Sequence, residues 1–162
     1  MKNSNIKIII LFGIVILIYL YFNFLTNKII DVNPNIIIFD MKLFYSPTLF
    51  YSNLSLYDAS IKYYLIIFRV VDMFFPFAYS ILLIQLLYKV KSKIYIIPII
   101  ALFSDLVENG LLAYKMFVNQ AYNEIIIYFL NAVTLLKFIA IFISIILIII
   151  LVIKERRLTY EK

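Results

Sequence analysis

Four long apolar segments constrain this chain more than any other feature of its sequence. They comprise residues 8–25, 63–88, 94–114 and 125–153. About 20 helical residues cross a hydrocarbon core of about 30 Å, so each segment is long enough to span a membrane. Lipid offers the backbone no hydrogen-bond partners, and such segments are therefore helices. The sequence predicts an all-α membrane protein, a four-transmembrane-helix bundle that forms a single membrane domain over residues 1–162.

The amino-acid composition agrees with a membrane protein and excludes several kinds of chemistry. Of the 162 residues, 65% are hydrophobic, whereas about half are apolar in a typical soluble domain. The chain has no Cys and no His. Disulfides, thiolate nucleophiles, imidazole bases and the usual zinc and haem ligands are therefore excluded. We expect no metal site and no cofactor.

Basic residues predict the orientation of the chain. The formal net charge is +6, from 15 Lys and Arg and 9 Asp and Glu. By the positive-inside rule, both termini are cytoplasmic and residues 26–62 form an outer loop of a multi-pass protein. Bases at segment ends favour contact with membrane lipids and argue against nucleic-acid binding. The cytoplasmic set is Lys2, Lys7, Lys89, Lys91, Lys93, Lys154, Arg156, Arg157 and Lys162, and the outer set is Lys28, Lys42, Lys62 and Lys115.

The outer loop contains signals for local structure. Asn33-Pro34-Asn35 predicts a turn, and Ser46 before Pro47 predicts the start of a helix. The spacing of Ser55 and Asp58 resembles a capping box that leads into the second span. We expect a short amphipathic capping segment between the first and second transmembrane helices, on the outer face of the bundle.

Polar side chains interrupt three of the four spans. The helical repeat places each set on one face, with Lys137 at the edge of its face. An ionisable group at the centre of a span costs about 2.5–3.5 kcal/mol, so these faces should look into the bundle. The set comprises Arg69, Asp72 and Tyr79 in the second span, Asp105, Glu108 and Asn109 in the third, and Asn131, Thr134 and Lys137 in the fourth.

Depth predicts that these side chains meet in the outer half of the bundle. Counted from the basic residues at the cytoplasmic ends, Asp72, Glu108 and Lys137 lie about 22–25 Å deep, at one level. On the first span, Asn23 and Thr26 would cover the cluster. In the third span, we expect a continuous helix through Asn109-Gly110, because the apolar run continues beyond it; an unwound helix there is the alternative.

Three functions remain open for this polar cluster. The leading hypothesis is an acid-rich pocket that binds a small amphipathic or cationic ligand. The second is a membrane-embedded lipid-modifying enzyme in which Asp105 or Glu108 transfers a proton while Arg69 or Lys137 holds an anionic group. The third is a structural or accessory subunit, in which the charges form an ion-pair network or meet a membrane-protein partner.

The runs YSPTLFY, RVVDMFFPFAY and IPIIALFSDLVENGLL resemble a pattern in uncharacterised small bacterial four-helix integral membrane proteins. The resemblance covers most of residues 39–140 and implies an architecture in a bacterial plasma membrane, without an activity. Its matching positions are Asp40, Tyr45, Ser46, Pro47, Arg69, Asp72, Pro76, Tyr79, Pro98, Asp105, Glu108 and Asn109. In topology alone, the chain is also distantly similar to the sterol-isomerase and sigma-2-receptor superfamily.

Overall fold

The computed structural model describes residues 2–160, and the side chains of residues 5–40 and 42–154. Among the basic residues that predict the orientation, Lys162 lies outside the described residues, as do the side chains of Lys2, Arg156 and Arg157. The side of the membrane that each end faces stays a prediction.

Within residues 2–160 the structure is helical and contains no strand. Four helices are long and apolar enough to cross a membrane, over Asn5–Val32, Ala59–Lys89, Ile96–Val118 and Glu124–Lys154, which confirms the predicted number of spans. The elements are α1 (Lys2–Val32), a 3-10 turn (Phe39–Met41), α2 (Pro47–Leu54), α3 (Ala59–Lys89), α4 (Ile96–Ala113), a π-helical turn (Tyr114–Val118) and α5 (Glu124–Tyr160).

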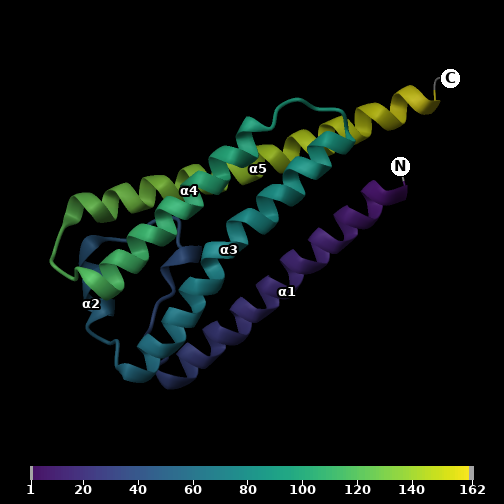
Figure 1. Ribbon diagram of the computed structural model, residues 1–162. Coiled ribbons are helices and arrows are strands. Elements are labelled where there is room, and N and C mark those ends of the chain that lie inside the picture. Colours follow the sequence, from purple (N-terminus) through teal and green to yellow (C-terminus); the bar gives the residue numbers. More distant parts are fainter. Residues whose placement is uncertain (1, 161–162) are drawn as a thin grey trace.

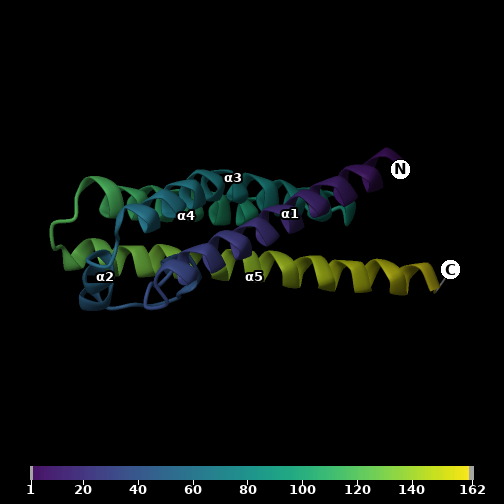
Figure 2. The same cartoon turned by 90° about the horizontal axis from the view of Figure 1, so that it is seen from below.

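The long helices alternate in direction, so that both termini lie at one end of the bundle and α2 lies at the other (Figure 1). We call the end that holds residues 33–58 the loop end. Helix α4 packs against α3 and α5, and α1 packs mainly against α3. Figure 2 shows that the N-terminal part of α1 runs apart from α5. The bundle interior is therefore built mostly by α3, α4 and α5.

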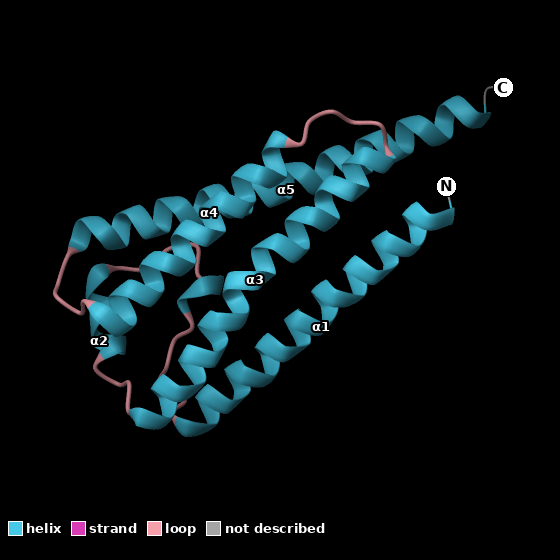
Figure 3. Cartoon of the chain, in the orientation of Figure 1, coloured by secondary structure: helices cyan, strands magenta, loops and turns pink. Residues whose placement is uncertain are grey.

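The first helix is longer than the sequence predicts. It continues beyond Leu25 to Val32 because Leu25 and Ile29, one turn apart, are both buried on the face that meets the core. It ends where the predicted turn begins, and the Asn33 side chain accepts a hydrogen bond from the Asn35 backbone N–H at 3.0 Å. The connection to α3 is therefore shorter than residues 26–62 (Figure 3).

Helices α2 and α3 begin at capped residues. The Ser46 hydroxyl accepts from the Leu49 N–H at 3.2 Å, and Pro47 is the first residue of α2, as predicted. The Asp58 carboxylate accepts from the Ile61 N–H at 2.8 Å and caps α3. The predicted capping box is wrong, because Ser55 follows the last residue of α2 and its hydroxyl donates to the carbonyl of Ser52.

An aromatic core fastens the connection to the loop end of the bundle. The ring of Phe39 lies 4.6 Å from that of Tyr45 and 4.9 Å from that of Phe50, measured between centroids. All three side chains are almost fully buried and belong to one apolar cluster with Leu65 of α3 and Ile127 of α5. Residues 39–50 thus cover the ends of α3 and α5.

Helix α4 is continuous through Asn109 and Gly110, as the sequence predicts. One turn later the winding widens to a π-helical turn at Tyr114–Val118. This turn buries Lys115, whose ammonium donates to the carbonyl of Ala121 at 2.6 Å. No sequence signal pointed to this change of winding.

Candidate functional site

The nine polar residues singled out in the spans are all buried inside the bundle. Helix α3 carries three of them, α4 three and α5 three. The predicted inward orientation of these side chains is confirmed, and their role in binding stays a prediction. The exposed fractions range from 0% for Glu108, Asn109 and Thr134 to 7% for Tyr79.

One charged group is centred on Arg69. Both terminal nitrogens of its guanidinium bind the carboxylate of Asp40, and the Nη2 contact measures 2.7 Å. Nη1 also donates to Asp72 Oδ2 at 3.2 Å, three residues along the same helix. Such fork-like pairing of Arg with a carboxylate is strong and fixes the orientation of both groups. The connection between α1 and α3 thus supplies a charged partner to the interior of the bundle.

Sequence reasoning missed Asp40 as a member of the cluster. Its signal was a single acidic residue within the apolar run IIIFDMKLF, and it was also a matching position of the resemblance. Burial raises the pKa of the Asp40 carboxyl, but the adjacent Arg69 guanidinium, with smaller contributions from Asp72 and Lys137, outweighs it, and the pKa lies below its ordinary value. Asp40 is therefore ionised at neutral pH.

A second charged group is centred on Lys137. Its ammonium lies 2.5 Å from Glu108 Oε2 and 3.3 Å from Asp105 Oδ1. The hydroxyl of Thr134 donates to Glu108 Oε1 at 2.6 Å, and that of Tyr79 donates to Asp105 Oδ2 at 2.9 Å. The prediction that Lys137 lies at the edge of its face is wrong. It is only 6% exposed, because both acids on α4 face it.

Asn109 joins the two charged groups. Its Nδ2 donates to the backbone carbonyl of Asp72 at 3.0 Å and to Asp105 Oδ1 at 3.3 Å. Polar contacts therefore run without interruption from Asp40 to Lys137, across α3, α4 and α5. We call Asp40, Arg69, Asp72, Asp105, Glu108, Asn109 and Lys137 the charged cluster.

Asn131 has a different role from the one its position suggested. Its amide does not bind a charged side chain and pairs instead with the peptide group of Tyr45, through Oδ1 at 3.2 Å and Nδ2 at 2.8 Å. The predicted cover by Asn23 is also wrong, because Asn23 is exposed and donates to the carbonyl of Tyr19, on its own helix. Thr26 is half-buried, and its place over the cluster stays a prediction. From the connection between α1 and α3, Asp40 binds Arg69 and Tyr45 binds Asn131.

The charged cluster contains more acids than bases. Its four carboxylates belong to Asp40, Asp72, Asp105 and Glu108, and its two bases are Arg69 and Lys137. Lys115 is also buried, but it lies two turns beyond Glu108 and binds Ala121. Two carboxylates are therefore in excess within a region of low dielectric constant.

Five buried polar atoms around the cluster have no hydrogen-bond partner among the described residues, and one of them, Glu108 Oε2, lies within ion-pair distance of Lys137. On the carboxylate-rich side, Asn109 Oδ1 is an acceptor without a donor. The other three are Arg69 Nε and the hydroxyls of Tyr45 and Tyr57. Buried polar atoms in native proteins are nearly always paired with protein or water. These atoms are therefore exceptions that call for an explanation.

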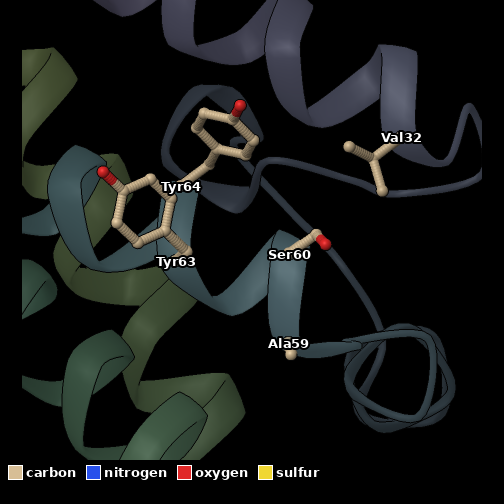
Figure 4. A pocket seen from close by; sticks show the side chains of 5 residues that line it. All are labelled: Val32, Ala59, Ser60, Tyr63 and Tyr64. Carbon is tan, nitrogen blue, oxygen red and sulfur yellow. The ribbon is translucent and has the colours of Figure 1, made fainter.

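A separate pocket of about 420 Å³ opens at the loop end, where α1 ends and α3 begins. Val32 lines it from α1, and Tyr63 and Tyr64 line it from the first turns of α3 (Figure 4). None of the nine predicted site residues lines this pocket. Among the described residues, no group of three or more Asp or Glu is arranged to hold a metal ion.

No protein-family model matches the chain, and neither a curated protein nor a solved structure matches it.

Proposed function

We propose that this chain is a multi-pass integral membrane protein that binds a small amphipathic cation in the charged cluster. In this proposal both termini are cytoplasmic, the loop end faces outward, and the membrane is the plasma membrane of a bacterium. The cluster then lies in the outer half of the bundle, beneath residues 39–50. Four helices that are long and apolar enough to span a membrane support the location.

The excess of two buried carboxylates is the observation that carries this proposal. An unpaired carboxylate away from water costs several kcal/mol, so each surplus charge needs a proton or a cation. A ligand with a positively charged nitrogen supplies the charge for one of the two carboxylates, and a proton neutralises the other. Asn109 Oδ1, which is buried and unpaired, adds an acceptor for an N–H group of the ligand. The apolar surroundings suit the hydrocarbon part of an amphipathic molecule.

Native mass spectrometry of the protein extracted with its own lipids tests this proposal. We expect a cationic molecule to copurify with the wild type and to be lost from Glu108→Gln. Glu124→Gln is the matched control, because Glu124 is exposed and far along α5 from the cluster. Absence of a bound cation from all three proteins, or equal retention by all three, would contradict the proposal.

A second candidate function is that of an accessory subunit of a membrane complex. One observation favours it: each of the four carboxylates lies within ion-pair distance of Arg69 or Lys137. Such a network would specify which helices pack together and add little net stability. The same mass spectra distinguish the two functions, because an accessory subunit would retain a second polypeptide and no small cation.

A further inference from the structure

Three buried hydrogen-bond donors near Asp40 have no acceptor among the described residues. They are Arg69 Nε and the hydroxyls of Tyr45 and Tyr57. The side chains are nine-tenths buried or more, with exposed fractions of 4%, 2% and 7%. One unpaired donor is an isolated defect, but three around one ion pair indicate a missing acceptor.

The two tyrosines belong to the connection between α1 and α3, and they pack in the same apolar cluster as Phe39, the neighbour of Asp40 in the chain. Burial raises the pKa of Tyr45, the carboxylates of Glu108 and Asp40 raise it further, and Arg69 lowers it. Burial likewise raises the pKa of Tyr57, where Arg69 acts to lower it and Asp40 to raise it. Both tyrosines therefore stay protonated and can donate a hydrogen bond. The charges of both Arg69 and Asp40 act on each tyrosine.

The charge of Arg69 limits the chemistry of the missing acceptor. Two carboxylates, from Asp40 and Asp72, already bind its terminal nitrogens, and its Cζ lies 5.6 Å from the centroid of the Phe68 ring. A further anion would be repelled by those carboxylates. The acceptor that fits beside Nε is a neutral oxygen, which a hydroxyl group supplies. A hydroxyl can also donate to or accept from the two tyrosines.

We propose that the ligand is an amphipathic amino alcohol, whose hydroxyl lies among Arg69 Nε, Tyr45 and Tyr57. Its charged nitrogen then lies on the side of Asn109 and the surplus carboxylates. The site of the hydroxyl and the site of the charged nitrogen are adjacent, because Asn109 binds the backbone of Asp72 and the Asp72 side chain binds Arg69. This inference rests on the proposed function, to which it adds the hydroxyl group.

Three probes of equal chain length test the inference: dodecylamine, its vicinal amino-alcohol derivative and dodecanol. Their affinities for the purified protein in detergent micelles are measured by native mass spectrometry. We expect the wild type to bind the amino alcohol about tenfold more tightly than dodecylamine, which corresponds to about one well-made hydrogen bond. Dodecanol should bind most weakly, because it lacks the charge.

Tyr57→Phe removes one hydroxyl and keeps the ring. It should reduce the preference for the amino alcohol to about threefold. Tyr63→Phe should retain the full preference, because Tyr63 is 62% exposed. Circular dichroism confirms that each variant keeps its helix content.

The possible results separate the two proposals. If dodecylamine binds no better than dodecanol, the cationic ligand of the proposed function is wrong. If dodecylamine binds better than dodecanol but as tightly as the amino alcohol, ordered water satisfies the donors; the hydroxyl site is then wrong, and the proposed function stands. A preference that stays at the full tenfold in Tyr57→Phe would also overturn the hydroxyl site.

Discussion

The side-chain amide of Asn131 pairs with the peptide group of Tyr45, although 86 residues separate them. Oδ1 accepts from the Tyr45 N–H, and Nδ2 donates to the Tyr45 carbonyl. Both peptide atoms are thereby satisfied in a buried place where water does not reach them. The connection between α1 and α3 is held to α5 by a contact that carries no net charge and does not depend on pH.

Asn131→Ala should destabilise the protein strongly. The substitution leaves a buried N–H and a buried carbonyl without partners, at about 1–3 kcal/mol each. We expect the free energy of unfolding in mixed micelles to fall by about 3 kcal/mol. Asn23→Ala is the control, because Asn23 is exposed and binds only its own helix. An equal loss in both variants would show that the Tyr45 contact contributes nothing.

Asp40→Asn should destabilise the protein at neutral pH and have little effect in acid. Removal of one partner from a buried ion pair costs about 3–5 kcal/mol. The folded-state pKa of Asp40 is lowered, chiefly by Arg69 acting against burial, with further contributions from Asp72 and Lys137. Its stabilisation is therefore present above the ordinary pKa of about 4 and is lost as pH falls through the lower folded-state value.

Unfolding measured from neutral pH down to acid checks this dependence. The difference between the wild type and Asp40→Asn should shrink as the wild-type carboxyl becomes protonated. Asp31→Asn is the control, because Asp31 is exposed at the end of α1. A difference that stays constant with pH would contradict the ion pair.

Lys137→Met should be more harmful alone than together with Glu108→Gln. Alone, it leaves Glu108 and Asp105 buried without their base, at a cost of about 3–5 kcal/mol. The second substitution removes one of those charges. A double-mutant cycle on unfolding free energies should therefore show a favourable coupling of about 1–3 kcal/mol. Lys28→Met, on an exposed residue, serves as control, and strictly additive losses would argue against contact between the two groups.

Asp58→Ala should cost about 1 kcal/mol through loss of the cap of α3. Asp58→Ser keeps an acceptor for the Ile61 N–H and should restore most of the stability. Ser55→Ala should have little effect, because Ser55 does not cap α3. Unfolding measurements on the three variants check the assignment. A larger loss of stability in Ser55→Ala than in Asp58→Ala would show that Ser55 caps α3 after all, as the predicted capping box requires.

Gly110→Ala should leave the protein unchanged or stabilise it by up to about 1 kcal/mol. A Cβ at this position meets no heavy atom within 4 Å, and the helix is continuous there. Alanine loses less conformational entropy than glycine in a helix. The same measurement at Gly13→Ala provides a comparison in a helix whose continuity was never in question. A marked loss of stability in Gly110→Ala, without one in Gly13→Ala, would indicate that α4 unwinds at Gly110 in a functional conformation.

The helical repeat was sufficient to predict which faces turn inward. Asp72 and Glu108 are buried because an apolar span has only one favourable direction for a carboxylate, and that direction depends on local spacing alone. The continuity of α4 through Gly110 could be predicted for a similar reason, since the apolar run carries on beyond it. These features need no knowledge of distant residues.

Contacts between distant residues could not be predicted in this way. Asp40 meets Arg69 because the connection folds back over the bundle, and neither the spacing nor the hydropathy of residues 33–58 encodes that path. Asn131 was assigned to the charges because it shares their face, but its depth places it beside Tyr45. The extension of α1 to Val32 depends on burial of Ile29 in the loop-end core, which exists only after the chain has folded.

The positions of the charged residues along the chain have a consequence for biosynthesis. Asp40 leaves the ribosome before Arg69, so the arginine has a partner available as soon as α3 is inserted. Asp105 and Glu108 emerge before Lys137, and a nascent chain that ends with α4 has four carboxylates and one base in its interior. The lysine of α5 therefore supplies the second base last, and a product truncated before residue 137 should be cleared by quality-control proteases.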